Sequence, residues 1–394
     1  MLRSFRRVTL VAALVAGVAT GATTIAASAS PISPGNSILP VTAPSHVLAD
    51  GPGSVISTAP LPVDKWVPGS GDAFVVTYRS TGVGGELATV SGSVFLPKGQ
   101  APPGGWPVVS WAHGTTGLGD GCAPSVEGPS PRTRDYLAAW LAQGYAIVAT
   151  DYLGLGTPGV HPYLDGRIAA YGVVDMVRAA RSIVSALSDR WVVVGQSQGG
   201  HATMFTANLA TRYAPELDFR GAVATGVPAN LQGLVPAIGP AFPPTLLGAE
   251  MKSYIAYILA GLRAARPDFD LRSYLTPLGE SVLTDAETLC GTEMAKRMAD
   301  VGLGEMFTRQ LGEPFRQAWD AIYTIPATGY DRPFFIAQGD KDTVAFPFLT
   351  KRLVDDLAAN GQPCTYRTYP ADHGGTPVAA LPDTTAFVRT LFAA

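Results

Sequence analysis

A serine flanked by glycines follows an apolar segment in the middle of the chain. Residues 191–194 read Trp-Val-Val-Val, as in a buried strand, and residues 195–199 read Gly-Gln-Ser-Gln-Gly. In a G-x-S-x-G turn the chain reverses sharply from a strand into a helix, and the glycines permit this because a Cβ atom there would clash. Residues 200–209 are suited to the helix that must follow. Ser197 is therefore a candidate nucleophile for attack on an acyl carbon.

A serine nucleophile needs a base and an acid, and α/β-hydrolases place them in the chain order Ser, acid, His. Of the five histidines, His373 lies in a loop that follows a late predicted strand and can return to the serine. The predicted strand 333–337 is followed by Asp340 and Asp342. We favour Asp342 over Asp340 because Gly-x-x-Asp followed shortly by Val and Pro is the usual layout. Its carboxylate would hold the imidazole tautomer and stabilise the imidazolium.

The tetrahedral intermediate of acyl transfer needs hydrogen-bond donors directed at its oxygen. The backbone N–H of Gln198, the residue after the nucleophile, is expected to be one donor. The other should come from the loop after an earlier strand, and residues 113–117, which read His-Gly-Thr-Thr-Gly, follow the predicted strand 107–112. We assign the second donor to the backbone N–H of Thr115.

Apolar β-branched segments alternate with helix-period segments along most of the chain, which predicts a mainly parallel sheet covered by helices on both faces, with an antiparallel start. This is the arrangement of an α/β-hydrolase. The predicted strands are 73–78, 87–96, 107–112, 145–150, 191–194, 220–225, 333–337 and 364–369. The predicted helices are 134–141, 167–187, 200–213, 348–359 and 383–391.

The alternation is interrupted once, and we interpret residues 230–331 as an inserted helical cap between two parts of the hydrolase core, 63–229 and 332–394. A structureless loop of that length would be unusual in a compact protein. The insertion follows the strand 220–225 at the carboxyl end of the sheet, where ligands bind in open α/β sheets. Apolar segments such as 254–259 suggest a site for acyl chains, although most of these residues should pack the core of the cap itself.

The N-terminus predicts export. Residues 1–29 have the basic start, short apolar centre and Ala-x-Ala end of a signal peptide, and residues 30–62 form an arm rich in Pro, Ser and Gly. We expect a secreted protein, extracellular or associated with the cell envelope. No later segment is long and apolar enough for stable membrane insertion. A net charge of −3 with 15% charged residues argues against a nucleic-acid partner.

Three cysteines, Cys122, Cys290 and Cys364, make an odd set for an exported protein, so one disulfide and one buried thiol are expected. Cys364 lies in what we interpret as a core strand and is left free, which pairs Cys122 with Cys290. The absence of C-x-x-C argues against a zinc or redox motif. We expect no metal ion and no organic cofactor.

One motif suggests a different ligand. Gly154, Gly156 and Gly159 match the G-x-G-x-x-G fingerprint of dinucleotide-binding proteins and follow the predicted strand 145–150. That fingerprint requires a helix to begin at its third glycine. Prolines follow at 158 and 162, and the predicted helix begins later, so we reject nucleotide binding.

Several linked motifs, at 111–117, 122–125, 151–159, 161–163 and 195–200, together resemble the secretory lipase family of α/β-hydrolases. The resemblance extends over most of the mature chain, including the cap. It implies hydrolysis of triacylglycerols or shorter acyl esters, and it supports a Cys122–Cys290 bridge between the oxyanion loop and the cap.

We therefore expect a secreted carboxylic ester hydrolase, a triacylglycerol lipase or lipase-like esterase, that acts through an acyl-enzyme on Ser197. Its partner would be a small-molecule or lipid ester, and a lipid ester could be bound at a lipid–water interface. An acyltransferase or a peptidase would use the same three residues. A protein of another class, a non-catalytic lipid-binding protein, would keep the fold without the reaction, and the complete set of Ser, Asp, His and oxyanion residues speaks against it.

Overall fold

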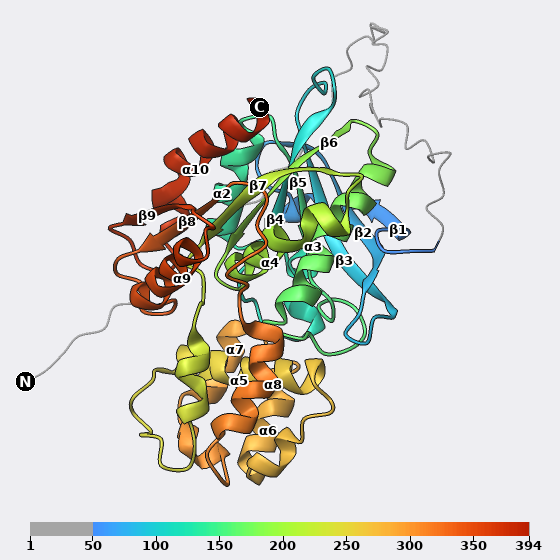
Figure 1. Ribbon diagram of the computed structural model, residues 1–394. Coiled ribbons are helices and arrows are strands. Elements are labelled where there is room, and N and C mark those ends of the chain that lie inside the picture. The colour runs from blue at the N-terminus through green and yellow to red at the C-terminus, as the bar shows by residue number, and fades with distance from the viewer. Residues whose placement is uncertain (1–49, 394) are drawn as a thin grey trace, which may run out of the picture. The chain divides into compact units, whose positions relative to one another are not determined.

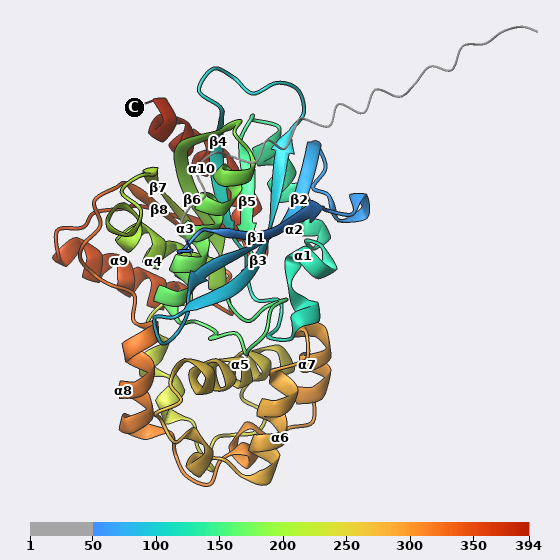
Figure 2. The ribbon, with the colours of Figure 1, turned by 90° about the vertical axis from the view of Figure 1, so that its right-hand side faces the viewer.

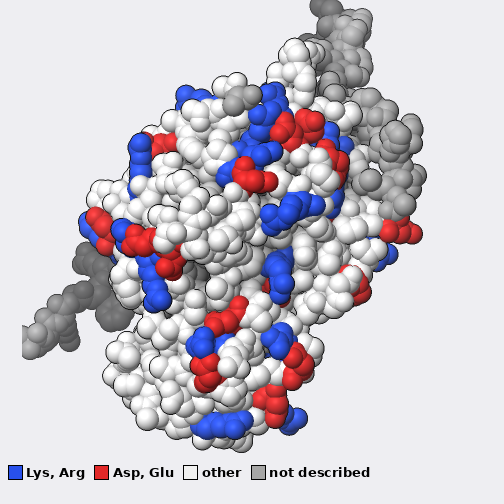
Figure 3. Space-filling view, in the orientation of Figure 1, with Lys and Arg blue, Asp and Glu red and all other residues white. Residues whose placement is uncertain are grey.

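A computed structural model describes residues 50–393 of the chain (Figure 1). The signal peptide predicted at 1–29 and the first part of the arm, 30–49, lie outside the described residues. Within residues 50–393 no helix is long and apolar enough to cross a membrane. Acidic and basic side chains are intermixed on the face that Figure 3 presents.

A nine-stranded sheet forms the centre of the fold, in the order β1-β2-β3-β5-β4-β6-β7-β8-β9. β1, β2, β3 and β5 pair antiparallel, and the strands from β5 to β9 pair parallel. The predicted mainly parallel sheet with an antiparallel start is thus confirmed. The strands are β1 Val55–Pro60, β2 Ser70–Thr81, β3 Leu87–Pro97, β4 Trp106–Ala112, β5 Ala146–Thr150, β6 Leu187–Gln196, β7 Asp218–Thr225, β8 Phe334–Gly339 and β9 Thr365–Tyr369.

Helices cover both faces of this sheet (Figures 1 and 2). α3 (Gly166–Ile183), α4 (Gln198–Tyr213) and α9 (Pro347–Ala359) pack on one face, and α2 (Pro131–Leu141) and α10 (Thr376–Ala393) on the other. Because successive strand residues point to opposite faces, Val193 of β6 joins the first cluster and Val192 and Val194 join the second. Burial on both faces explains the continuous apolar runs of the central strands.

The helix predicted over 167–187 was too long. α3 ends at Ile183, and Leu187 already begins β6, where it pairs with Trp106 of β4. Leu187 and Val184 are buried in the same apolar cluster as α3, so the burial period continues past the end of the helix. Apolar spacing alone therefore did not locate this boundary.

Both edges of the sheet differ from expectation. The arm predicted over 30–62 contains a strand, β1, whose backbone pairs with β2 although all but its first residue is exposed. β9, which we interpreted as a core strand, is the opposite edge and has no buried residue. Edge strands are held by backbone hydrogen bonds more than by side-chain burial, so their apolar pattern is weak. Cys364, just before β9, is free and only partly buried.

Residues between β7 and β8 form a group of helices with an apolar cluster of their own (Figures 1 and 2). The cluster also takes in Leu118, Tyr163 and Leu164, which belong to loops of the sheet domain. The helices are α5 Ala249–Ala265, α6 Pro277–Ala286, α7 Gly291–Met298 and α8 Gly312–Tyr323. We call these four helices and their connections the cap, and we keep 230–331 as its proposed limits.

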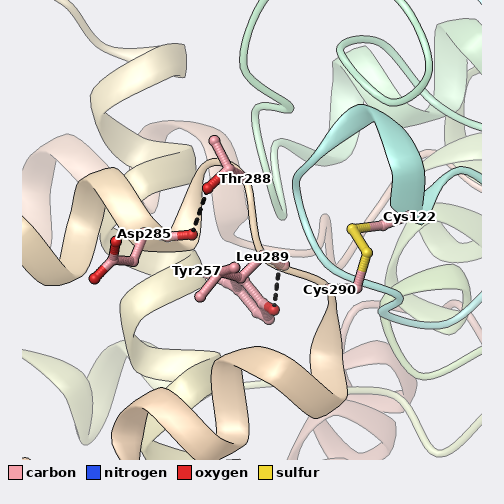
Figure 4. The surroundings of a disulfide bond; sticks show 6 residues. All are labelled: Cys122, Tyr257, Asp285, Thr288, Leu289 and Cys290. Carbon is pink, nitrogen blue, oxygen red and sulfur yellow. Dashed lines mark hydrogen bonds between the residues drawn. A yellow bond between two sulfur atoms is a disulfide. The ribbon is translucent and has the colours of Figure 1, made fainter.

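A disulfide joins Cys122 to Cys290, as expected (Figure 4). Cys122 ends a short 3-10 helix after the loop 113–117, and Cys290 precedes α7 of the cap. Beside the bond, the N–H of Gly291 donates to the carbonyl of Thr116 at 2.9 Å. The loop that carries Thr115 is thus tied to the cap both covalently and by a backbone hydrogen bond.

Removal of this bond should destabilise the protein. The bond closes a segment with a sequence separation of 168, and such cross-links stabilise mainly by restricting the unfolded chain. We expect the Cys122→Ser/Cys290→Ser variant to lose about 2–4 kcal/mol of unfolding free energy, measured by guanidinium denaturation. Cys364→Ser is the matched control because it removes a thiol that forms no bond. Equal midpoints for the two variants would contradict this expectation.

Candidate active site

Ser197 lies at a strained turn between β6 and α4. Its backbone has φ 59° and ψ −122°, a conformation that costs a residue with a side chain about 1–3 kcal/mol and persists where the surroundings enforce it. A Cβ atom on Gly199 would lie 1.8 Å from the carbonyl oxygen of Ala112, and one on Gly195 would lie 2.2 Å from that of Gly199. Both glycines of the motif are therefore required by backbone contacts, as predicted for a serine at the tip of a strand-to-helix turn.

His373 and Asp342 form a hydrogen-bonded pair. The imidazole Nδ1 is 2.7 Å from Oδ2 of Asp342, which is 3% exposed. The other carboxylate oxygen accepts backbone N–H groups from Val344 and Ala345, both at 2.8 Å. A carboxylate at Nδ1 favours the tautomer with its proton there, which leaves Nε2 as the basic nitrogen. Asp340, the alternative acid, is exposed, and no hydrogen bond from it to His373 is found.

Ser197 and His373 line one polar cavity of about 280 Å³, together with Thr115 and Gln196. The Nε2 of His373 is buried and makes no hydrogen bond to any residue in 50–393. A nitrogen that is basic, buried and unpaired beside a serine is suited to take up a proton from a hydroxyl group.

The sequence interpretation missed Gly226, which shapes the place of the imidazole. Its φ is 55°, and a Cβ atom there would lie 3.1 Å from both Nδ1 and Cε1 of His373. Gly226 directly follows β7, at the sheet edge where the serine turn also emerges. The sequence could have indicated this role, because Gly226 immediately follows β7 and β7 pairs with β6, the strand that leads to Ser197.

Both predicted oxyanion donors lie at the serine. Gln198 is the first residue of α4, and the N–H groups of a first helical turn have no partner within the helix. Thr115 lies in the loop after β4 and lines the polar cavity with Ser197. Its N–H donates to no residue that the structure describes. Two backbone donors are therefore available next to the candidate nucleophile.

Three other histidines are buried and neutral. Burial lowers the pKa of His113, lowers that of His161 to about 3 and lowers that of His201 to about 4. Each ring is held by at least one backbone carbonyl: His113 by Gly114, His161 by Leu153 and His201 by Tyr323. Groups that stay neutral across the physiological range are poor candidates for a proton-transferring base.

A second cavity, about 340 Å³ and mostly apolar, also reaches Ser197. Its walls come from the segment 228–247, from α5 and from Val344 and Phe346. Two of its lining side chains, Leu234 and Leu246, are 45% and 63% exposed. Ser197 thus stands between a polar and an apolar chamber, an arrangement that fits a substrate with one end of each kind.

No group of three or more metal-ligating side chains is found in residues 50–393. The glycine fingerprint at 154–159 does not open a helix, because α3 begins only at Gly166. The geometry that a dinucleotide pyrophosphate needs at a helix N-terminus is therefore not formed by these glycines.

Comparisons with known proteins agree with this geometry. The family model for secretory lipases matches residues 134–324. Lipase A of Moesziomyces aphidis is 26% identical over 61% of this chain and 52% of its own length, and the secreted triacylglycerol lipase LIP4 of Malassezia globosa is 24% identical over 74% and 65%. A probable inactive lipase of Mycobacterium tuberculosis, MT1628, is 26% identical over 62% and 55%.

The chain spans between about half and two thirds of the length of these curated relatives. Among solved structures, Candida antarctica lipase A in its closed state matches with a TM-score of 0.74 and 21% identity, over 90% of this chain and 85% of that one. This structural likeness shows the fold, and the family model and the curated relatives show similarity in sequence. The chain is similar to the secretory lipase family over residues 134–324 and has an α/β-hydrolase fold.

Proposed function

We propose that the protein is a secreted serine hydrolase of carboxylic esters, a triacylglycerol lipase or lipase-like esterase. The observation that supports this most directly is the Asp342–His373 pair in the cavity that Ser197 lines. The match to the secretory lipase model agrees with it. Secretion is supported by the family and by the secreted relative, and an extracellular or cell-envelope location remains our proposal.

In the proposed reaction Nε2 of His373 removes the proton of the Ser197 hydroxyl, and the serine oxygen attacks the ester carbonyl. The N–H groups of Gln198 and Thr115 stabilise the oxyanion of the tetrahedral intermediate. The imidazolium, stabilised by Asp342, returns the proton to the departing alcohol. Water, deprotonated by His373, then attacks the acyl carbon. The bond between the acyl carbon and the Ser197 oxygen breaks, the acid leaves, and the imidazolium returns its proton to the serine oxygen.

The two chambers suggest where the ends of the substrate bind. The apolar cavity is within the usual size range of small-molecule sites, roughly 300–1,000 Å³, and suits an acyl chain. The polar cavity contains Thr115 and Gln196 and suits the alcohol part. We therefore propose acyl esters with an apolar acid, including lipid esters, as substrates.

A fluorophosphonate probe tests the nucleophile, because it reacts with activated serines only. We expect labelling at Ser197 and hydrolysis of p-nitrophenyl esters that improves as the acyl chain fills the apolar cavity. Transfer to added alcohols and cleavage of amides would identify an acyltransferase or a peptidase instead. The name of the relative MT1628, probable inactive lipase, gives the non-catalytic alternative a definite basis. Absence of both labelling and hydrolysis in folded protein would favour that alternative.

A further inference from the structure

Two side chains of one loop each hold one of the residues that we assign to the oxyanion hole. The loop runs from β5 to α3, and His161 and Tyr163 lie two positions apart in it. Nε2 of His161 is 2.6 Å from the side-chain nitrogen of Gln198. The hydroxyl of Tyr163 is 2.6 Å from the hydroxyl of Thr115. Neither contact was expected from the sequence, where these residues served only as a family motif.

The contact between His161 and Gln198 has a definite direction. Nδ1 of His161 lies 2.8 Å from the carbonyl oxygen of Leu153, which can only accept, so Nδ1 carries the ring proton. Nε2 is then an acceptor, and the amide of Gln198 donates to it. Burial lowers the pKa of His161 to about 3, which keeps the ring neutral and this direction fixed. The other amide atom of Gln198 is buried without a partner in the described residues, so His161 alone orients the side chain.

Tyr163 braces Thr115 from the side of the cap. Its ring packs edge-on against Tyr257 of α5, with ring centres 6.0 Å apart. A Cβ atom at Gly261, also in α5, would lie 2.6 Å from the backbone nitrogen of Tyr163, so this helix contacts the loop backbone directly. Burial raises the pKa of Tyr163 to about 12, which keeps its hydroxyl protonated as a donor or acceptor for Thr115.

The loop itself is firmly anchored. Pro162 fixes one φ angle between the two residues. Asp165 caps α3 by accepting hydrogen bonds from the N–H groups of Arg167 and Ile168. Leu164 has a φ of 62°, a conformation that the surrounding packing must maintain. The two bracing side chains therefore project from a backbone with little freedom.

We propose that His161 and Tyr163 are positioning residues that fix both halves of the oxyanion hole, a role that rests on the proposed hydrolase function. Donors in such a site must lie within about 2.7–3.1 Å of the developing oxyanion, and an error of about 1 Å can cost about 10²-fold in rate. His161 acts on the first residue of α4, and Tyr163 acts on the loop after β4. One segment thereby sets the distance between the two donors.

The test compares four substitutions that each remove one of the two hydrogen bonds, His161–Gln198 or Tyr163–Thr115, and keep both backbone donors. They are Tyr163→Phe, Thr115→Val, His161→Gln and Gln198→Met. We expect each to lower kcat roughly 10- to 100-fold with KM changed less than about 3-fold. The reason is that the oxyanion forms in the transition state and the tetrahedral intermediate and is absent from the bound ester. The inhibition constant of a trifluoromethyl ketone, which forms an oxyanion adduct, should rise by the same factor as kcat falls. If His161→Gln does not fold, Gln198→Met tests the same contact from the other side.

Tyr163→Phe and Thr115→Val break one hydrogen bond, so the double variant should lose no more than either single variant. Matched controls are Tyr330→Phe, which removes a hydroxyl that donates to the carbonyl of Pro326, and His201→Gln, which replaces a buried histidine held by the carbonyl of Tyr323. Additive losses, or equal losses in the controls, would overturn the positioning role. If the wild type is active and the four variants keep its kcat, the positioning role of His161 and Tyr163 is wrong and the proposed function stands. If the wild type is inactive, both the proposed function and the positioning role are wrong.

Discussion

We expect the replacement of Ser197 by alanine to lower the turnover of a p-nitrophenyl ester by about 10⁴- to 10⁶-fold and to leave the protein folded. The loss is large because the substitution removes the atom that attacks the ester, and a residual rate would come only from binding and the oxyanion donors. Stability should change little, because the Ser197 hydroxyl donates to no residue between 50 and 393. Initial rates and a circular dichroism melt measure the two effects.

The matched control is Ser182→Ala, purified in the same way. Ser182 lies in α3, and its hydroxyl bonds a carbonyl one turn back, away from both cavities. This variant should keep the wild-type rate and react with a fluorophosphonate. Near-wild-type turnover by a folded Ser197→Ala protein, free of contaminating esterase, would be incompatible with the proposed mechanism.

Asp342→Asn should lower kcat about 10⁴-fold, and the structure gives the reason. The carboxylate oxygen that accepts from Val344 and Ala345 must remain an acceptor, so the carbonyl of an asparagine takes its place. The NH₂ group then faces Nδ1 of His373. A donor at that position favours the tautomer with its proton on Nε2, which cannot accept the serine proton. The variant should fold normally and be slow, as measured by single-turnover kinetics.

Asp340→Asn is the matched control for this substitution because it makes the same chemical change two residues earlier in the same turn. Asp340 is exposed, so we expect a rate within about 2-fold of wild type. The pair also decides between the two acids that the sequence left open. A larger loss in Asp340→Asn than in Asp342→Asn would reverse our assignment.

The candidate triad was predictable because each member directly follows a strand of the sheet. Ser197 follows β6, Asp342 lies in the turn after β8, and His373 lies in the loop after β9. These strands are parallel, so their carboxyl ends meet at one edge and bring the three residues together. Local apolar patterns identified β6 and β8, residues 364–369 were predicted as a strand although β9 proved to be an exposed edge, and the sheet geometry supplied the rest.

Contacts that depend on tertiary packing were not predictable in the same way. β1 and β9 are held by pairing with a neighbour, and neither shows the apolar pattern of a buried strand. The hydrogen bonds of His161 and Tyr163 join positions 37 and 48 residues apart, and nothing in either local sequence indicates its partner. The pattern of apolar residues in a sequence predicts which residues are buried, but it does not predict which polar side chains bond to each other.

The bond between Cys122 and Cys290 has a topological consequence. Residues 243–246 are exposed and lie between the two cysteines, so a protease that cleaved there would produce two fragments still linked by sulfur. Ser197 would be on one fragment and His373 on the other, while β7 of the first fragment remained paired with β8 of the second. The nicked protein would migrate as one species until a reductant separated the fragments, and the two fragments together would still contain all three residues of the candidate triad.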